Sequence, residues 1–382
     1  MRASRANVPA WSAPSFLGMH ILLIAPYFGG SHRAWAEGYA RHSRHHIAVL
    51  HLPARFWTWR MQGGAVTLAQ RARELYIASD TPDAPDLLLT TDMLNLPTFL
   101  GLSRDWLRDT PAALYCHENQ LTYPTPPGQK RDLTYAMINW LSMLAADQVF
   151  FNSEYHRADW FEALPRFLKH FPDFTHVHRI AAVEAKASVL PVGCDLARLD
   201  RARPAAQPDD DGPPIILWNQ RWEYDKAPAV FFRALDALVA EGIDFRIALA
   251  GSNVRQQPEE FEAARERLGA RVIHYGRADA ATYAQLLWAA DIVVSTARHE
   301  FFGIAVVEAM YAGCFPVLPH RLTYPELLPL THHARCLYGD FEELLAHLRW
   351  AIHEVDAARA LAAELQASMA RFDWAVMAPR YD

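Results

Sequence analysis

The sequence predicts an α/β protein with two parallel-sheet domains that face a central cleft. Three observations predict this fold. At 382 residues, the chain is longer than one compact core normally supports. Short apolar runs alternate with segments of helical spacing, which is the pattern of strands and helices around parallel sheets. Residues 201–214, with four prolines and three consecutive aspartates, interrupt this alternation and predict a linker between the domains.

The first domain is expected over residues 19–200, after an N-terminal extension of residues 1–18 outside the fold. Met19 opens the first apolar strand, at residues 21–25. The extension has no long apolar segment of the kind that a signal peptide needs, and no run in the chain is long enough to span a bilayer. The four cysteines form no CxxC pair, which predicts buried thiols in a reduced compartment. We therefore expect a cytoplasmic protein without membrane insertion, and the sequence leaves its oligomeric state open.

A glycine pair follows the first strand. Gly29 and Gly30 allow the backbone to approach a phosphate or a sugar closely, and ligands bind at this position in open parallel sheets. Ser31 is a candidate N-cap for the helix that follows. A glycine pair also occurs where a chain only needs to reverse, so the sequence leaves both interpretations open.

The second strand, at residues 46–53, leads into a segment in which arginines alternate with aromatic residues. Arg55, Trp57, Trp59 and Arg60 suit an unpaired base and its phosphates, although aromatic residues at this density also fill cores. Residues 1–73 contain nine arginines and one acidic residue, whereas the whole chain has a net charge of −6. The sequence therefore predicts a basic region in an acidic protein, and leaves open whether the tryptophans stack on a base or pack in the core.

Polar residues follow the third and fourth strands, which are expected within residues 85–94 and 112–120. These residues are Asp92, Asn95, His117, Glu118 and Asn119. The carboxyl ends of parallel strands meet at the sheet edge where ligands bind, so we expect these side chains to face the cleft. His117 is the candidate for sugar recognition or proton handling, because imidazole titrates near neutrality. A histidine tied to the backbone at a strand end is the alternative interpretation.

The remaining elements continue the alternation of strands and helices. The first domain should contain a proline-rich loop at 121–132, a helix at 132–146, a strand at 148–154 and a helix at 155–171. The second domain is expected over residues 215–355, with strands within 215–218, 245–253, 272–277 and 289–297. One final helix is expected over roughly 340–369. Residues 356–382 are expected to cross back to the first domain.

Two pairs of charged residues follow strands of the second domain. Arg221 and Lys226 follow its first strand, and Glu300 and Glu308 follow a later one, so parallel topology places both pairs at one sheet edge. Gly303 precedes a helical segment whose first N–H groups suit a diphosphate, and a carboxylate one turn in can accept from ribose hydroxyls. Fixed cations can neutralise a departing diphosphate as Mg²⁺ would, so no metal is needed. The sequence therefore predicts a site for a sugar nucleotide and no metal site.

The order of these features resembles the GT-B glycosyltransferases, and within them the retaining family 4 group. The features are the glycine pair, the histidine at a strand end, Arg-x4-Lys and Glu-x7-Glu. The resemblance implies a GT-B fold of two Rossmann-like domains, with the nucleotide-sugar donor in the second domain. It also implies that Glu308 binds ribose, that Glu300 binds the donor sugar, and that Arg221 and Lys226 bind the diphosphate. His117 would lie beside the transferred sugar.

Two sets of site residues follow from the sequence together with this resemblance. The expected catalytic residues are His117, Arg221, Lys226 and Glu300. The expected donor-binding residues are Gly29, Gly30, Arg221, Lys226, Glu300, Phe302, Gly303, Ile304 and Glu308. Two positions depart from the family pattern, because Phe301 stands where many members carry glycine, and Cys314-Phe315 replaces smaller residues before Pro316. These departures bear on the identity of the donor more than on the fold.

Several segments resemble the tRNA-queuosine alpha-mannosyltransferase subgroup more closely. Among them are APYFGGSHRAWAEG, LPARFWTWRMQGGA, CHENQLTYP, FNSEYHR, NQRWEYDKAP and RHEFFGIAVVEAM. This resemblance implies transfer of mannose from GDP-mannose to the cyclopentenediol of queuosine, at the wobble position of an aspartate tRNA. The acceptor-binding residues expected on this basis are Ser31, His32, Arg33, Arg55, Trp57, Trp59, Arg60, Glu118 and Asn119.

The expected reaction is a front-face transfer, because no carboxylate nucleophile is obvious for a retaining mechanism. A phosphate oxygen of the donor would take the proton of the attacking hydroxyl. Three alternatives stay open: transfer to a lipid or saccharide acceptor, epimerisation of a sugar nucleotide without an acceptor, and RNA binding without catalysis. The residues alone do not choose between GDP and UDP or between mannose and another hexose.

Overall fold

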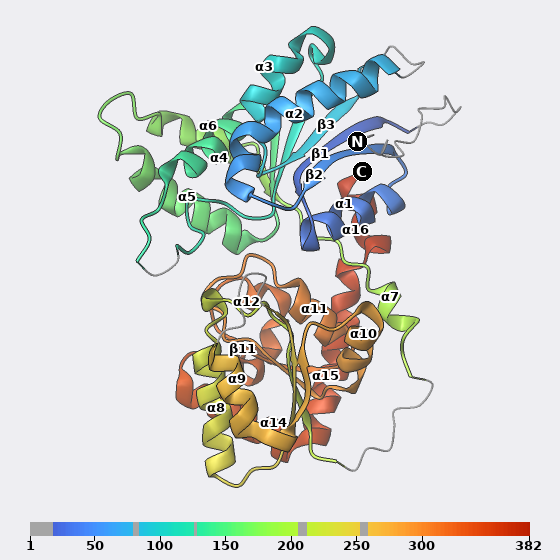
Figure 1. Cartoon of the computed structure of the whole chain (residues 1–382), viewed down its shortest axis with the longest axis vertical. Coiled ribbons are helices and arrows are strands. Elements are labelled where there is room, and N and C mark those ends of the chain that lie inside the picture. The colour runs from blue at the N-terminus through green and yellow to red at the C-terminus, as the bar shows by residue number, and fades with distance from the viewer. Residues whose placement is uncertain (1–17, 79–83, 126–127, 205–211, 253–258) are drawn as a thin grey trace, which may run out of the picture.

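The computed structural model describes residues 18–78, 84–125, 128–204, 212–252 and 259–382. They form two α/β halves, which lie one above the other in Figure 1. Each half contains one sheet of six parallel strands with helices packed around it. The prediction of an α/β fold with two parallel-sheet domains is therefore confirmed. The predicted extension apart from Gly18, and residues 205–211 of the predicted linker, lie outside the described residues.

The sheet of the first half has the strand order β2-β1-β3-β4-β5-β6. Its strands are β1 His20–Phe28, β2 His46–Pro53, β3 Leu87–Thr91, β4 Ala112–Cys116, β5 Gln148–Phe151 and β6 Ala187–Val189. Its helices are α1 Gly30–His42, α2 Trp57–Ala78, α3 Leu96–Leu107, α4 Leu133–Ala145, α5 Glu154–Leu168 and α6 Ile180–Glu184. Helix α7 Ala197–Asp200 follows on the path to the second half. Since all pairings are parallel, the loops after these strands share one edge of the sheet.

Alternate residues of β1 supply both faces of the first sheet. Ile21 and Leu23 belong to one buried apolar cluster, whereas Leu22 and Ile24 belong to another. Side chains alternate between the two faces of a strand, so a strand covered on both sides must be apolar throughout. This explains why the first strand is a continuous apolar run in the sequence.

The sheet of the second half has the strand order β12-β11-β10-β7-β8-β9. Its strands are β7 Ile215–Trp218, β8 Arg246–Ala250, β9 Val272–Gly276, β10 Ile292–Val294, β11 Phe315–Pro319 and β12 Leu337–Tyr338. Its helices are α8 Pro228–Ala240, α9 Glu259–Leu268, α10 Ala280–Ala289, α11 Ile304–Tyr311, α12 Tyr324–Leu327, α13 His333–Cys336, α14 Phe341–His353 and α15 Val355–Met369. The prediction of one long final helix is wrong. Helices α14 and α15 are separate because Glu354, with φ −107° and ψ 45°, leaves the helical conformation.

The last helix, α16 Trp374–Tyr381, lies in the first half, where it packs beside α1 (Figure 1). Trp374 contacts two glycines so closely that a Cβ atom on Gly38 would lie 2.1 Å from its ring, and one on Gly193 2.5 Å. The hydroxyl of Tyr381 donates to the carbonyl of Pro191 at 2.8 Å. The chain therefore crosses between the halves twice.

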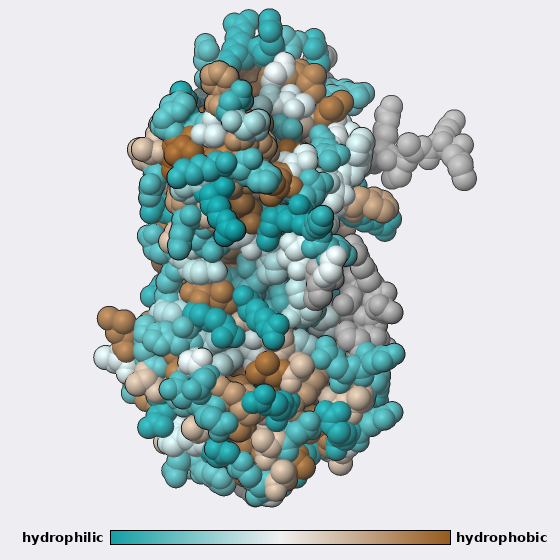
Figure 2. All heavy atoms as spheres, turned by 90° about the vertical axis from the view of Figure 1, so that its left-hand side faces the viewer, coloured by the Kyte–Doolittle hydropathy of each residue, from teal (hydrophilic) through white to brown (hydrophobic). Residues whose placement is uncertain are grey.

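The surface and the cysteines complete the description of the fold. Figure 2 shows small hydrophobic patches separated by hydrophilic residues on one face. None of the helices among the described residues is long and apolar enough to cross a membrane. All four cysteines are buried free thiols, as predicted.

Candidate active site

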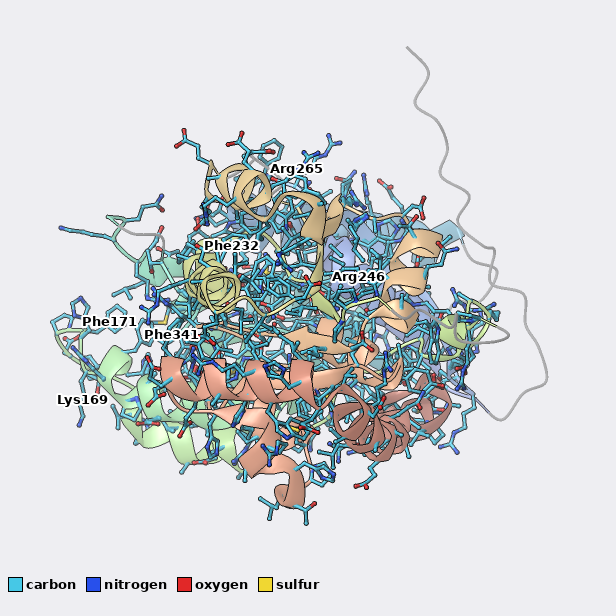
Figure 3. The ribbon with its side chains drawn as sticks, turned by 90° about the horizontal axis from the view of Figure 1, so that it is seen from below. Lys169, Phe171, Phe232, Arg246, Arg265 and Phe341 are labelled. Carbon is cyan, nitrogen blue, oxygen red and sulfur yellow. The ribbon has the colours of Figure 1, made fainter. Side chains whose placement is uncertain are left out.

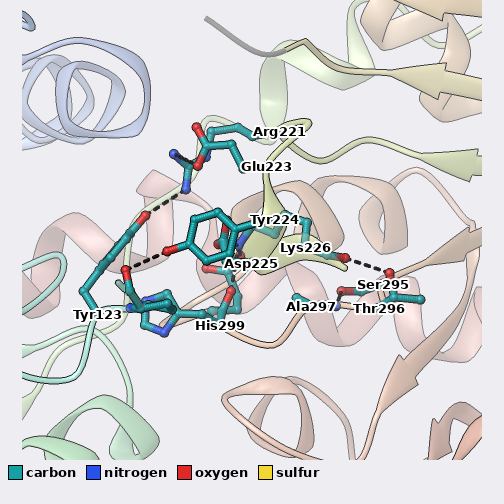
Figure 4. A network of polar contacts seen from close by, with 12 residues as sticks. Tyr123, Arg221, Glu223, Tyr224, Asp225, Lys226, Ser295, Thr296, Ala297 and His299 are labelled. Atoms are coloured by element: carbon teal, nitrogen blue, oxygen red, sulfur yellow. Dashed lines mark hydrogen bonds and ion pairs between the residues drawn. The ribbon is translucent and has the colours of Figure 1, made fainter. Parts of the chain in front are cut away.

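The candidate site lies where loops after the strands of the two halves meet. Arg221, in the loop after β7, donates from Nη2 to the hydroxyl of Tyr123 at 3.2 Å (Figure 4). The hydroxyl of Tyr224 donates to the carbonyl of Pro124 at 2.7 Å. Tyr123 and Pro124 belong to the loop after β4, so these bonds join the two halves beside the predicted catalytic residues.

Lys226 is a buried cation among three acceptors. Its Nζ donates to the carbonyl of His299 at 2.7 Å and lies 3.2 Å from Oε2 of Glu300. The same nitrogen lies 3.3 Å from Oδ2 of Asp225. Burial raises the pKa of Glu300, but the ammonium of Lys226 and the N–H of Phe302 together outweigh burial and hold the pKa below its usual range. The structure therefore brings one member of each predicted pair, Lys226 and Glu300, into direct contact.

Gly303 is the N-cap residue of helix α11; its φ of +90° lies in the left-handed region that favours glycine. The preceding N–H of Phe302 donates to Oε1 of Glu300 at 3.3 Å, while the ring of Phe302 is buried against Phe372. The helix itself offers no carbonyl to the N–H groups of its first turn, which starts at Ile304, because no helical turn precedes them. Such a helix start is suited to a phosphate group.

Glu308 lies in the second turn of α11, and both of its oxygens have partners. Arg198 of α7 forms an ion pair with Oε1. The hydroxyl of Tyr283 donates to Oε2 at 2.9 Å, and Asn219 donates to the same hydroxyl at 3.1 Å. Sequence reasoning missed Arg198 and Tyr283, because neither belongs to a recognisable motif. The only signal for Arg198 was its position immediately before the predicted linker.

The glycine pair lies at the start of α1. Gly29 is the N-cap residue of α1 and Ser31 already lies within the helix, so the prediction of Ser31 as the N-cap is wrong. Gly30 has a φ of +53°, which a glycine adopts without strain. A Cβ atom on Gly29 would lie 2.5 Å from the Cβ of Ala54, so the glycine turn packs against the segment that leads into α2.

His117 lies in a cluster of aromatic rings rather than at a solvent-exposed strand end. Its ring centroid is 4.4 Å from that of His32 and 4.7 Å from that of Trp35. Burial lowers the pKa of His117 well below its usual range, so the expectation that it titrates near neutrality is wrong. Burial, assisted by Arg221, lowers the pKa of His32 to about 4. Both imidazoles are neutral at physiological pH, and the side chain of His32 is buried.

Two carboxylates and an amide lie beside His117. Asp92 accepts from the backbone N–H of His117 at 2.8 Å, and burial and Glu118 raise its pKa well above the usual range. Burial also raises the pKa of Glu118, although the charge of Arg221 acts in the opposite direction. The side chain of Asn119 is fully buried and accepts from Thr122 N–H at 2.8 Å. Asn119 therefore stabilises its own loop, and its role in acceptor binding stays a prediction.

The structure separates the two tryptophans of the arginine-rich segment. Trp57 is half-buried and its ring lies 4.9 Å from that of Tyr135, so it packs in a small apolar cluster. Trp59 is 59% exposed, and Arg55 is exposed two residues before Trp57. Arg60 is half-buried, and its Nε donates to the carbonyl of Pro53. The core interpretation therefore holds for Trp57, and Trp59 is on the surface.

Two predicted features remain to be placed. Arg33 forms an ion pair with Glu37 at 2.8 Å on the exposed face of α1. Phe301, at a position where glycine was expected from the family pattern, stacks on His156 with ring centroids 3.9 Å apart. Its carbonyl accepts from Ser153 Oγ at 2.6 Å, so this departure forms part of the contact between the halves.

Within the described residues, no group of three or more His, Cys, Asp or Glu side chains is arranged to hold a metal ion.

Comparison with known proteins places this geometry in context. Residues 20–194 match the family model of the tRNA-queuosine alpha-mannosyltransferase N-terminal domain, and residues 201–363 match the glycosyl transferases group 1 model. The chain is 34% identical to the tRNA-queuosine alpha-mannosyltransferase of Drosophila melanogaster over 316 residues, which cover 81% of this chain and 82% of the relative.

Solved structures show the same fold at low sequence identity. The Anabaena HepE structure in complex with UDP is 18% identical, with a TM-score of 0.67 over 95% of this chain and 98% of that one. The catalytic domain of starch synthase IV from Arabidopsis thaliana, bound to ADP and acarbose, is 12% identical, with a TM-score of 0.72 over 95% and 98% of the two chains. These similarities confirm the GT-B architecture predicted from the sequence.

Proposed function

Because the chain belongs to the tRNA-queuosine alpha-mannosyltransferase family, we propose that it transfers mannose from GDP-mannose to queuosine in tRNA. The acceptor hydroxyl is one of the two on the cyclopentenediol of queuosine, at the wobble position of an aspartate tRNA. The observation that carries this proposal is the arrangement of Arg221, Lys226, Glu300 and the start of α11 at one edge of the cleft. This arrangement suits the diphosphate and the sugar of a nucleotide donor.

Each donor group has a partner of suitable chemistry in the second half. The diphosphate is bound by Arg221, by Lys226 and by the first N–H groups of α11. The ribose hydroxyls donate to Glu308, a carboxylate that Arg198 and Tyr283 already orient. The donor sugar lies between Glu300 and His117. Because His117 is neutral, it can donate from one ring nitrogen and accept at the other.

The transfer proceeds from the face that the diphosphate leaves. The acceptor oxygen forms a bond to the anomeric carbon while the bond from that carbon to the β-phosphate oxygen breaks. The proton of the acceptor hydroxyl passes to a phosphate oxygen of the leaving GDP. Arg221 and Lys226 stabilise the negative charge that develops on the diphosphate, and fixed cations of this kind need no reorganisation during the reaction. The proposed donor site uses no metal ion.

A comparison of donors tests this proposal. The full-length protein is incubated with queuosine-containing tRNA and, separately, with GDP-mannose, GDP-glucose, UDP-glucose and UDP-galactose. The nucleosides are then analysed by mass spectrometry for a hexose on queuosine. We expect hexosylated queuosine with GDP-mannose and little with the other donors. Efficient transfer from a UDP-sugar instead would contradict the proposed donor.

A further inference from the structure

Phe56 combines high exposure with an unusual backbone conformation. Its φ is +52°, in the left-handed region that glycine and asparagine enter far more readily than an aromatic residue. The residue is 76% exposed, so core packing does not explain the presence of its ring. Its carbonyl accepts the first helical hydrogen bond of α2, from Arg60 N–H at 3.1 Å. Backbone strain of this kind is often found at functional positions.

A second exposed ring lies within one helical turn of Phe56. Trp59 is 59% exposed, and a Cβ atom on Gly63 would lie 2.6 Å from its indole. The indole therefore lies directly over Gly63, one turn further along α2, and a larger residue there would displace it. We call Phe56 and Trp59 together the aromatic pair.

The surroundings of the aromatic pair are basic. Arg55 is exposed beside Phe56, and Arg60 follows Trp59. Arg33 is also close to the glycine turn, and its guanidinium lies 5.8 Å from the ring centre of Phe28. Among residues 18–73, the only acidic residue is Glu37. This region therefore favours an anionic partner with flat apolar groups, a combination found in unpaired RNA.

The aromatic pair is also close to the candidate active site. The segment before Phe56 packs against the glycine turn, where a Cβ atom on Gly29 would contact Ala54 at 2.5 Å. That turn follows β1, whose carboxyl end shares the sheet edge of His117. A nucleotide bound at the aromatic pair could therefore belong to the same RNA as a nucleotide bound in the cleft.

We propose that Phe56 and Trp59 stack on an unpaired base of the acceptor RNA next to the modified nucleotide. The inference rests on the proposed function, since it assumes an RNA acceptor, and it assigns the contact to Phe56, which sequence reasoning had not selected. The nearby arginines bind the flanking phosphates. Stacking on a ring is tolerant of sequence because every base has a flat face. In this left-handed conformation the ring of Phe56 is exposed to solvent, where the base can reach it.

The chain contains a matched control for this proposal. Phe174 is 86% exposed and also has a positive φ, of +43°. It follows α5, which starts at the cleft edge and runs back to the opposite edge of the sheet, and it is preceded by Asp173. Lys169 and Phe171, at the same end of α5, lie at the outer edge of the molecule in Figure 3. Phe174 therefore shares the exposure and conformation of Phe56 and also has basic neighbours, Lys169 and Arg179 among them, but it does not share the position of Phe56 beside the glycine turn.

The test measures RNA affinity and stability in the same variants. The ligand is a queuosine-containing anticodon stem-loop RNA, and the proteins are the full-length wild type, Phe56→Gly, Phe56→Trp and Phe174→Gly. We expect Phe56→Gly to weaken RNA binding on the order of 10-fold or more. Its unfolding midpoint should stay the same or rise, because glycine adopts a positive φ without strain. Phe56→Trp should bind nearly as well as wild type, and Phe174→Gly should bind as wild type does.

Two outcomes would overturn the proposal: unchanged RNA affinity in Phe56→Gly, or an equal loss in Phe174→Gly. A parallel assay with the free queuosine nucleoside separates this inference from the proposed function. The nucleoside has no neighbouring base, so wild type and Phe56→Gly should use it equally. If no acceptor is modified by the wild type, the proposed function is wrong, whereas the stacking role is still decided by the RNA affinities.

Discussion

At the scale of single residues, the cluster of charged residues at the cleft was predictable and its environment was not. Lys226 and Glu300 were predicted at the same sheet edge from their positions after two parallel strands, and they lie 3.2 Å apart. The spacing of residues in a strand–loop unit fixes which edge they occupy, and that is sufficient for such a pair. The pairing of Glu308 with Arg198 could not be predicted, because it depends on how the chain returns to the second half after residue 194.

Removal of the cations at the proposed diphosphate site should slow the reaction. We expect Arg221→Ala to lower kcat on the order of 10²–10³-fold, since a fixed charge stabilises the leaving group mainly in the transition state. Lys226→Ala should have an effect of similar size. Because Lys226 is buried beside Asp225, its loss should also lower the unfolding midpoint, whereas loss of the exposed Arg221 should not.

Steady-state kinetics with saturating donor and tRNA would measure this loss, and Lys169→Ala provides the control. Lys169 lies at the periphery of the molecule (Figure 3), so its removal should leave kcat unchanged. Turnover near the wild-type rate in both Arg221→Ala and Lys226→Ala would mean that the diphosphate binds elsewhere.

His32 should make the stability of the protein depend on pH below neutrality. Its pKa is about 4 in the folded protein because of burial and the charge of Arg221, compared with 6.5 for an ordinary histidine. Below pH 6.5 the unfolded chain binds a proton that the folded protein does not, so stability falls as the pH drops from 6.5 toward 4. At pH 5 the loss due to His32 is on the order of 2 kcal/mol.

Urea unfolding at pH 7 and at pH 5 would measure this effect. Other groups titrate in the same range, and the raised pKa values of Asp92 and Glu118 act with the opposite sign. A comparison of wild type with His32→Gln isolates the histidine. The variant should lose less of its free energy of unfolding between the two pH values, and equal losses would show that His32 does not remain neutral in the folded protein.

At the scale of elements, strands were easier to predict than helix ends. Strand β2 has the predicted bounds, because its apolar run is flanked by polar and proline residues. The division between α14 and α15 was missed because Glu354 is not a residue that normally ends a helix. The N-cap of α1 was assigned to Ser31 from its preference, whereas the close packing of Gly29 on Ala54 fixes the start earlier.

The packing of α16 on α1 depends on a glycine in the middle of α1. A Cβ atom on Gly38 would overlap the ring of Trp374, at 2.1 Å. Gly38→Ala should therefore lower the free energy of unfolding by about 1–3 kcal/mol through overpacking, although alanine is the better helix former. The control is Gly101→Ala in α3, where an added Cβ would meet no atom within 4 Å.

Urea unfolding of these two variants gives a direct comparison. Gly101→Ala should stabilise the protein by about 0.5–1 kcal/mol, because glycine loses more backbone entropy in a helix than alanine does. If Gly38→Ala lowers the free energy of unfolding and Gly101→Ala raises it, the close packing of Trp374 on Gly38 is supported. Stabilisation by both would show that α16 is not packed on α1 in this way.

At the scale of the whole molecule, the two sheets were predictable and the contacts between the halves were not. The alternation of strands and helices on each side of residues 201–214 was sufficient for the sheets. One contact that joins the halves runs between two helices: Glu326 of α12 accepts from the N–H of Glu154, at the start of α5, at 2.9 Å. A helix start attracts a carboxylate, but no sequence pattern shows which distant carboxylate arrives there.

The most direct test of the central claim is transfer of radiolabelled mannose from GDP-mannose to purified aspartate tRNA, with and without queuosine at the wobble position. The proposed function predicts label only on the queuosine-containing tRNA, because the attacking hydroxyl belongs to the cyclopentenediol. Label on both tRNAs, or on neither while the donor still binds, would contradict queuosine as the acceptor.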